Sequence, residues 1–272
     1  MRFRHLIKVL LRQWCCGVAD GSEHSESKPP DETPSRQSAE NKTPISLAEQ
    51  QADKPFPNLE LSVLQSTHLT TNTVLQIRPE GLEGTTRGDG TVLFGPDKAD
   101  ANDCVIEEYN ESEYATHFKV HFSTASQRYY LSDMGYGSGT FVKVTAAVPL
   151  KESNIVSFGD HHVIAQLDEG KLSLNFIEGP KKGERYMFSD DEHVVVGRLA
   201  DCQVNCEDPN LSRHQCRFWH SAERGWELAD GSEAKGSLNG TWVFADENYE
   251  VTEGMFFRAG QNLFQAHLAV RE

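Results

Sequence analysis

The 272-residue chain contains 41 acidic and 26 basic residues, which gives a formal net charge of −15. This balance excludes a general nucleic-acid-binding surface, because binding to the phosphate backbone needs clustered positive charge. At 38% apolar residues the chain can build one or two cores of about 100 to 150 residues each. The six cysteines show no repeated paired spacing and no secretory signal precedes them, so we expect an intracellular protein, cytoplasmic or nuclear.

Residues 1–19 differ from the rest of the chain, because they contain four basic residues and no acid. The remaining residues therefore carry −15 − 4 = −19. Lys8 interrupts the apolar run, which is too short to span a bilayer. Three alternatives fit this basic amphipathic segment: residues 1–16 contact an anionic membrane and Cys15 and Cys16 accept lipid, or the segment is an organelle transit peptide, or it is a solvated tail.

Residues 20–69 are assigned to a linker. Up to Pro57 the sequence is rich in Ser, Glu, Pro and Lys and nearly free of branched apolar residues. Such a segment cannot bury enough surface to offset the entropy lost on ordering, so we expect it to be disordered.

From residue 70 onward, short alternating apolar runs such as TVLQI, FKVHF and TFVKV are separated by Gly, Asp, Asn and Pro. No window shows a helical period longer than two turns. Alternation with frequent turn residues is typical of strands in an all-β sandwich.

Comparison of the chain with itself shows a repeat at offsets of 97 and 101 residues. The matching segments are YYLSD with WELAD, GTFVKV with GTWVFA, and ESNIVSFGDHHVIAQL with EGMFFRAGQNLFQAHL. A period of this size equals one whole sandwich. We therefore predict two copies of one domain, at residues 70–168 and 171–271.

The second copy contains VVVGR, DPNLSR, WELAD and SLNGT in this order. With these motifs it resembles a forkhead-associated (FHA) domain over its full length. That family folds as a two-sheet β-sandwich and binds phosphothreonine peptides with the loops at one end. The resemblance implies an all-β protein of two tandem FHA-like sandwiches after a disordered N-terminal segment. It also implies a phosphothreonine-binding adaptor in signalling, whose partners are phosphothreonine-containing proteins.

The resemblance assigns phosphopeptide binding to four residues: Arg198, Ser212, Arg213 and Asn239. A phosphothreonine carries a charge of about −1.5 to −2, and a planar guanidinium supplies paired, charge-assisted donors to it. The side-chain amide of Asn239 can donate to and accept from the peptide backbone. The supporting residues implied by the resemblance are Gly197, Gln215, Gly240 and Thr241.

Two features of the second copy depart from the family pattern. The family usually has a histidine at the position of Gln215, where it braces the loops from behind. An amide can also bridge two backbone groups, so we expect the fold to survive this change. The segment 231–235, GSEAK, lengthens the connection between WELAD and SLNGT.

The first copy lacks the expected binding residues. Pro96 stands where the second copy has its arginine, and proline brings neither charge nor donor. With His117 aligned on the bracing position, Tyr114 and Ala115 replace the serine and the second arginine, and Ser138 replaces the asparagine. We expect a degenerate FHA-like domain that serves packing or a phosphate-independent partner.

No enzyme motif is present: the chain has no P-loop, nucleophile elbow or HExxH, so we expect neither an enzyme nor a cofactor. A zinc site could be imagined from Cys202, Cys206, His214 and Cys216. We favour no metal, because Cys202 and Cys216 alternate toward a core, where free cysteine behaves as a small apolar residue. His161 and its neighbour are expected to be surface or satisfied core residues.

Two functions therefore remain open after the sequence analysis. The first is the phosphothreonine-reading adaptor, with its site in the second copy. The second is a structural scaffold that binds partners through its sandwich surfaces without phosphate. Dependence on phosphate separates the two.

Overall fold

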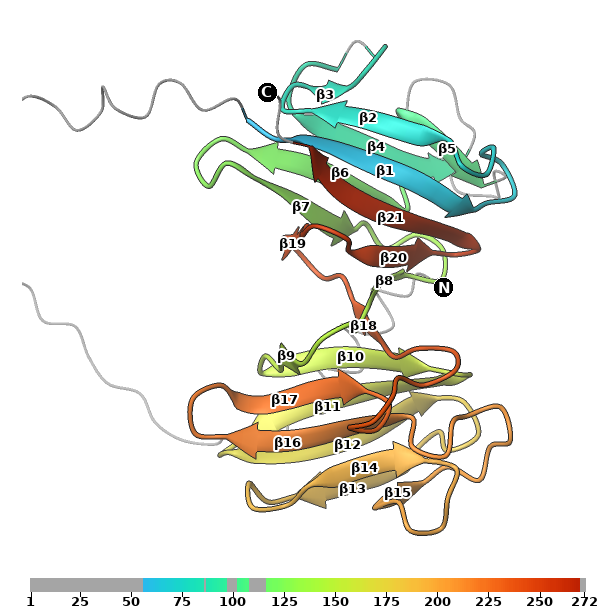
Figure 1. Ribbon diagram of the computed structural model, residues 1–272, viewed down its shortest axis with the longest axis vertical. Helices are drawn as coiled ribbons and strands as arrows, with labels where there is room; N and C mark the ends of the chain where they lie inside the picture. Colours follow the sequence, from blue (N-terminus) through green and yellow to red (C-terminus); the bar gives the residue numbers. More distant parts are fainter. Residues whose placement is uncertain (1–55, 86, 97–101, 108–115, 270–272) are drawn as a thin grey trace, which may run out of the picture.

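The computed structural model describes residues 56–269 except 86, 97–101 and 108–115. These residues form strands, turns and loops, and the expected all-β class is confirmed (Figure 1). Within them, no helix has the length and apolar composition that a membrane span requires. The basic segment 1–19, with Cys15 and Cys16, lies outside the described residues.

Twenty-one strands follow one another along the described chain. The strands before the first crossing between the two halves of the molecule are β1 (Asn58–Gln65), β2 (Val74–Arg78), β3 (Gly81–Leu82), β4 (Thr91–Pro96), β5 (Cys104–Glu107), β6 (Phe118–Ser123), β7 (Arg128–Asp133) and β8 (Thr140–Lys143). Those between the two crossings are β9 (Val148–Pro149), β10 (Ser153–Phe158), β11 (His161–Asp168), β12 (Lys171–Glu178), β13 (Arg185–Phe188), β14 (Val194–Gly197), β15 (Val204–Asn205), β16 (Cys216–Ser221), β17 (Gly225–Asp230) and β18 (Trp242–Phe244). The last three are β19 (Tyr249–Glu250), β20 (Phe256–Ala259) and β21 (Asn262–Ala269).

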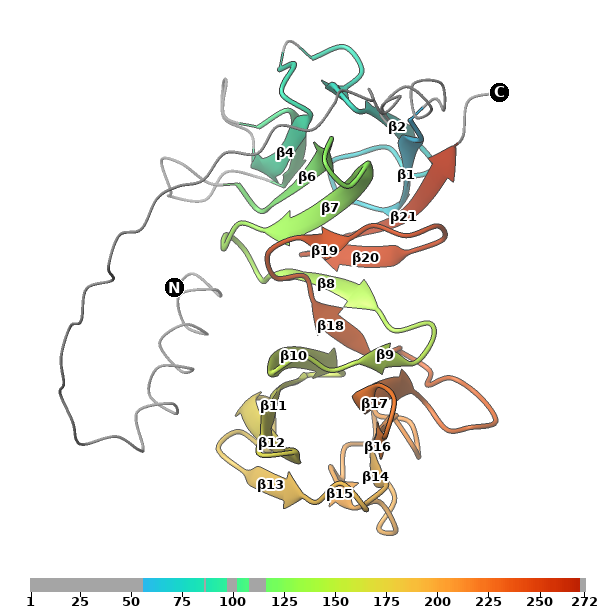
Figure 2. The same ribbon diagram turned by 90° about the vertical axis from the view of Figure 1, so that its left-hand side faces the viewer.

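One long sheet runs through the whole molecule in the order β13-β12-β11-β10-β18-β8-β20-β21-β1-β2-β3. Two smaller sheets cover its ends, one of order β15-β14-β16-β17-β9 and one of order β19-β7-β6-β4-β5. The result is two β-sandwiches, each with its own core. We call the sandwich built by β1–β8 and β19–β21 the first sandwich, and the one built by β9–β18 the second (Figure 2).

The alternation of apolar residues places each strand against its core. In β1, Leu59, Leu61 and Val63 are fully buried, whereas the residues between them are half-buried. Burying such a side chain stabilises the fold by about 1.5–3 kcal/mol. This strand lies inside the expected linker 20–69, so the folded region begins earlier than predicted. Its NLELSVLQ alternation is the sequence signal that the linker assignment overlooked.

The strand pairing crosses the boundary expected between the two copies. The hairpin β10–β11 belongs to the first repeat in sequence, yet it pairs with β12 at Ala165↔Leu174. Conversely, β21 pairs with β1 at Leu61↔Ala266. The expected boundaries, 70–168 and 171–271, therefore do not separate the two cores. Because the two hairpins share one apolar alternation, that pattern does not specify which sandwich each completes.

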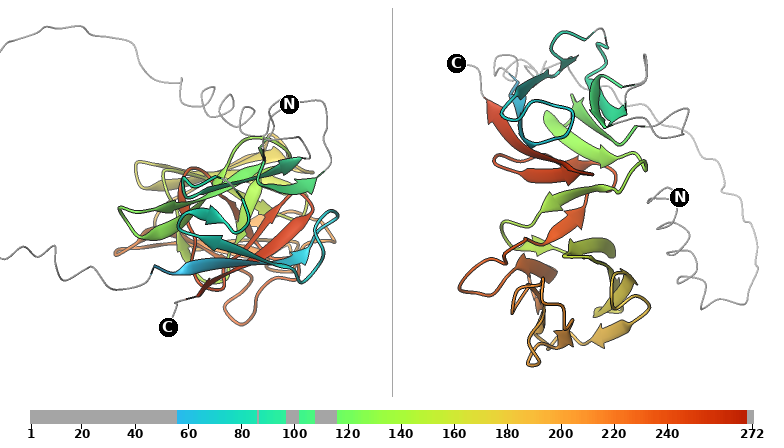
Figure 3. Two further views of the ribbon diagram at one scale, coloured as in Figure 1. Left: turned by 90° about the horizontal axis from the view of Figure 1, so that it is seen from above. Right: turned by 90° about the vertical axis from the view of Figure 1, so that its right-hand side faces the viewer.

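The exchange is centred on the antiparallel pair β8–β18. Val142 faces Val243 at the middle of this pair, with Phe141 opposite Phe244 at one end. The strand order on one side of the pair repeats the order on the other, and β8 and β18 lie at the narrow waist between the sandwiches (Figures 2 and 3). The chain crosses this waist once after β8 and once after β18. The second sandwich is therefore one continuous segment inserted between two parts of the first.

Candidate functional site

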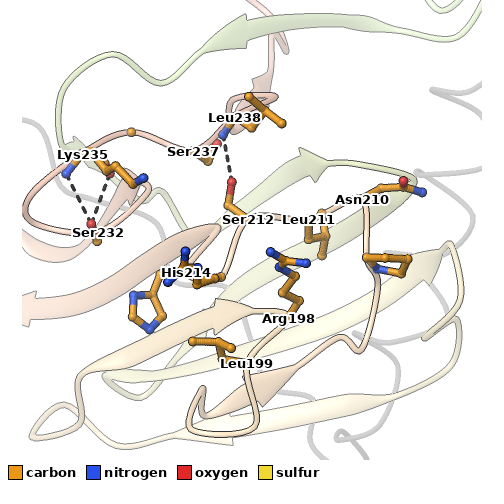
Figure 4. Close-up of a pocket in the computed structure, with 13 residues that line it drawn as sticks. Arg198, Leu199, Asn210, Leu211, Ser212, His214, Ser232, Lys235, Ser237 and Leu238 are labelled. Carbon is orange, nitrogen blue, oxygen red and sulfur yellow. Dashed lines mark hydrogen bonds between the residues drawn. The ribbon is translucent and has the colours of Figure 1, made fainter.

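A cleft of about 680 Å³ lies at one end of the second sandwich, where three loops meet (Figure 4). These loops follow β14, connect β15 to β16, and connect β17 to β18. The lining residues are Arg198, Leu199, Pro209, Asn210, Leu211, Ser212, Arg213, His214, Ser232, Lys235, Gly236, Ser237 and Leu238. We call this the cationic cleft.

The charges of the cationic cleft are all of one sign. Its lining includes Arg198, Arg213 and Lys235, and among the described lining residues there is neither an aspartate nor a glutamate. Within the described part of the chain, none of these three cations forms an ion pair. His214 adds a weaker contact, 4.0 Å from Nε2 to Asp201 Oδ1. An anion entering the cleft would meet three cations that are not neutralised by neighbouring carboxylates.

Ser212 stands with a free donor at the centre of the cleft. Its backbone N–H donates to Gln215 Oε1 at 3.1 Å, and its Oγ accepts the backbone N–H of Leu238 at 2.8 Å. The hydroxyl proton is therefore left to donate to an oxygen in the cleft. Figure 4 shows Arg198 and Ser212 reaching into the same space from neighbouring loops, which are joined by the Arg198 N–H to Ser212 carbonyl bond at 3.2 Å.

Gly197 allows these two loops to approach each other. A Cβ atom at this position would overlap the carbonyl oxygen of Arg213. The absence of a side chain lets the backbone of Leu199 donate to the same carbonyl at 3.4 Å. Glycine at 197 therefore brings the Arg198 loop against the Ser212–Arg213 loop.

Gln215 is buried behind the cleft and joins two of its loops. Its Nε2 donates to the carbonyl of Gly240 at 3.0 Å and to Ser237 Oγ at 2.8 Å, and its Oε1 accepts from Ser212. Thr241 is also buried and donates its hydroxyl to Asp230 Oδ1 at 2.7 Å. The amide of Gln215 thus spans from the serine loop to the SLNGT turn.

Asn239 lies beside the cleft rather than in its lining. Its side chain is exposed, and Nδ2 donates to the carbonyl of Asn210 at 3.2 Å. Gly240 follows at φ +78°, a conformation that favours glycine. Of the four expected binding residues, the structure brings three into the cleft and places Asn239 next to its Asn210 wall.

Two of the lining residues that the sequence did not predict, Lys235 and Leu238, bear on ligand binding. Lys235 comes from the GSEAK segment and adds the third cation, and Leu238 is 87% exposed beside the cleft. The sequence shows that this segment lengthens the loop, but it does not indicate that the lysine faces a cleft. The signal for Leu238 is a large apolar residue placed within a turn, between Ser237 and Asn239.

The imagined zinc cluster is not assembled. Asp201, Cys202 and His214 have potential ligand atoms within 4.8 Å of one another, but this group includes neither Cys206 nor Cys216. Burial raises the pKa of the Cys202 thiol, whose Sγ donates to the carbonyl of Arg213 at 3.4 Å. Burial also raises the pKa of Cys206 to about 12. Both thiols are buried in the second sandwich, as the alternation toward the core predicts for Cys202.

The corresponding end of the first sandwich lacks the arginine but keeps a brace. Pro96 is buried in β4, and Ser138 is exposed. His117 is buried, with Nε2 3.2 Å from the carbonyl of Gly139 and Nδ1 2.9 Å from Glu107 Oε1. Burial opposes the charged imidazolium, but the hydrogen bond and charge of Glu107 outweigh it and raise the pKa of His117. Tyr114 and Ala115 lie outside the described residues.

Comparison with known families finds a match to the FHA domain over residues 194–258. Members of this family generally bind phosphothreonine peptides in signalling, and they are binding modules rather than enzymes. The match begins in β14 and ends in β20, so it includes strands of both sandwiches. A search of curated proteins finds no match.

Proposed function

We propose that this protein is a phosphothreonine-peptide-binding adaptor in phosphorylation-dependent signalling, with the cationic cleft as its binding site. One observation carries the proposal. Arg198, Arg213 and Lys235 line a single cleft in a chain of net charge −15. No aspartate or glutamate is among the described residues that line it. Cations on an acidic protein are usually paired with neighbouring acids, and these three are not.

Each group of the cleft has a defined part in this function. The Arg198 guanidinium binds two phosphate oxygens at once, and Ser212 donates its hydroxyl proton to a third. Arg213 and Lys235 add positive charge at the rim, which attracts the dianion before contact. Asn239 binds the peptide backbone beside the phosphothreonine, with its free Oδ1 as an acceptor. None of these steps makes or breaks a covalent bond.

The first sandwich, in this proposal, is a degenerate copy of the same domain. Pro96 supplies no cation, and the buried His117, paired with the half-buried Glu107, occupies the position behind the loops. Its role is to support the second sandwich and to place it in the cell. The location we propose is intracellular, where the four described cysteines would remain thiols, as they are in the structure. Membrane contact through residues 1–16 remains a proposal of the same kind.

The test is binding of the full chain to a degenerate phosphothreonine peptide pool and to the same pool without phosphate. Arg198→Ala should weaken capture of the phosphorylated pool by about 10- to 150-fold, since a hydrogen bond to a charged group contributes about 1.5–3 kcal/mol. Arg78→Ala is the matched control, because Arg78 is exposed in the first sandwich and already paired with Glu83 at 2.8 Å. Capture that ignores both the phosphate and Arg198 would favour the phosphate-independent scaffold instead.

A further inference from the structure

The loop that carries Ser212 rests on a turn from the other repeat. This turn, at Gly159, connects β10 to β11, a hairpin that the sequence repeat assigns to the copy without the cations. Because the hairpins are exchanged, the turn lies beneath the DPNLS segment of the second sandwich. The cationic cleft is therefore lined by residues 198–238 alone, but its Ser212 loop is supported from behind by a turn of the expected first copy.

A side chain at Gly159 would force the side chain of Leu211 to move. Gly159 has φ +52°, and a Cβ atom there would lie 2.7 Å from Cδ2 of Leu211. Leu211 is buried with 3% exposure and directly precedes Ser212. The position of the serine thus depends on how Leu211 sits on the turn.

A second contact holds the beginning of the same loop. Asp208 Oδ1 accepts the backbone N–H of Asn210 at 2.8 Å, and the Asp208 carbonyl accepts that of Leu211 at 3.1 Å. Its other oxygen, Oδ2, lies 3.7 Å from Nε2 of His161, at the start of β11. His161 is fully buried, and within the described residues neither of its ring nitrogens makes a hydrogen bond. The expectation of a satisfied core histidine is therefore corrected.

The ring of His161 is also confined from its other side. A Cβ atom on Gly179, just after β12, would lie 2.8 Å from Nδ1 of His161. The imidazole therefore fits between a glycine and the Asp208 carboxylate. A buried polar ring without hydrogen bonds lowers the stability of the fold. Packing beneath the Ser212 loop would explain why a histidine stands at this position despite that cost.

We propose that Gly159 and His161 are positioning residues for the phosphate-binding loop. The expected second copy supplies the cations, and the β10–β11 hairpin of the expected first copy supports the loop that carries Ser212. This inference rests on the proposed function. It assigns the degenerate repeat a direct part in phosphopeptide affinity, through its exchanged hairpin. The other exchanged hairpin makes a corresponding contact in the first sandwich. A Cβ atom on Gly260, in the turn between β20 and β21, would lie 3.5 Å from Cε1 of His117.

The test compares two glycine variants of the full chain. Gly159→Ala places a methyl group against Leu211, whereas Gly170→Ala, beyond the other end of β11, meets no atom within 4 Å. Both glycines have positive φ, +52° and +80°, so both variants are strained and both should lower the midpoint of thermal unfolding. Only Gly159→Ala should also weaken binding of the phosphothreonine pool, by about tenfold, as expected for loss of one hydrogen bond to phosphate.

A rescue experiment separates positioning from general destabilisation. Leu211→Val removes the terminal carbon that the added methyl would strike and keeps a buried apolar side chain against the turn, so the double variant should bind more tightly than Gly159→Ala alone. If Gly159→Ala does not fold, His161→Ala tests the same support of the loop by removing the ring that lies beside Asp208. This variant should also weaken binding by several-fold.

The outcomes distinguish the inference from the function on which it rests. Unmodified protein that does not discriminate the phosphorylated pool overturns the proposed function. Phosphate-dependent binding that Gly159→Ala and Gly170→Ala reduce equally overturns only the positioning role. Selective loss with Gly159→Ala, restored by Leu211→Val, supports it.

Discussion

Replacing Gln215 by leucine would remove every hydrogen bond that crosses behind the cationic cleft through this side chain. Leucine is similar in size and suits a fully buried position, so the packing should change little. The lost bonds join the amide to Ser212 N–H at 3.1 Å, Ser237 Oγ at 2.8 Å, the Gly240 carbonyl at 3.0 Å and Thr241 Oγ1 at 3.4 Å. The perturbation is therefore polar rather than steric.

The expected loss of unfolding free energy depends on which groups are left without a hydrogen-bond partner. Ser237 Oγ keeps its bond to Asp230 Oδ1 at 2.6 Å, whereas Ser212 N–H and the Gly240 carbonyl lose the partners described above. A buried polar group without a partner costs about 1–3 kcal/mol, and of these two residues Gly240 is buried whereas Ser212 is half-buried in the cleft, so Gln215→Leu should reduce the free energy of unfolding by about 1–3 kcal/mol. Denaturant unfolding followed by the fluorescence of Trp226, which is buried in the second core, measures this loss.

Two variants control this experiment. Gln261→Leu makes the same chemical change at an exposed glutamine in the turn between β20 and β21, and it should cost less than about 0.5 kcal/mol. Gln215→His introduces a ring that can still donate to the Gly240 carbonyl, as His117 contacts the carbonyl of Gly139 at 3.2 Å, so it should lose less than Gln215→Leu. If Gln215→Leu costs less than about 1 kcal/mol, the loops do not depend on this amide and the reasoning is refuted.

Three further predictions concern charge and exposure. The raised pKa of His117 means that its pairing with Glu107 stabilises the fold fully below the unfolded pKa of about 6.5 and is lost as pH rises through the folded value. The stability advantage over His117→Gln, measured by urea unfolding, should therefore shrink with rising pH; a constant difference contradicts this. Lys235→Ala should weaken phosphopeptide binding several-fold at low salt and less at high salt, as titrations at two ionic strengths would show. Leu238→Glu should leave the unfolding midpoint within about 2 °C, because the side chain is 87% exposed, yet reduce phosphopeptide affinity by repulsion; unchanged affinity would place Leu238 outside the bound peptide.

Much of the fold could be predicted from local patterns in the sequence. Alternating apolar residues define a strand whichever partner it has, so the all-β class and the repeated hairpins followed from the sequence. The partner of each hairpin did not follow. Leu61 lies opposite Ala266 and Leu174 lies opposite Ala165, so the two ladders pair the same residue types and the local pattern does not distinguish them. The exchange appears in the structure at the β8–β18 pair, where the chain passes from one sandwich to the other.

The candidate site divides in the same way. The motifs pointed to Arg198, Ser212 and Arg213 because loops at one end of a sandwich lie close together in space, and these residues do line one cleft. Lys235 was missed because its approach depends on the path of the GSEAK loop. The role of Gly159 could not be foreseen either, since its contact with Leu211 exists only after the hairpins have exchanged.

The pairing of β1 with β21 has a mechanical consequence. Asn58 lies opposite Ala269, so the described chain enters and leaves the first sandwich side by side. Tension applied through the flanking segments would load the β1–β21 ladder first. The second sandwich, inserted between β8 and β19, lies outside that line of force (Figure 1). A tether at either end could therefore bear load while the cationic cleft, in the second sandwich, remains undeformed.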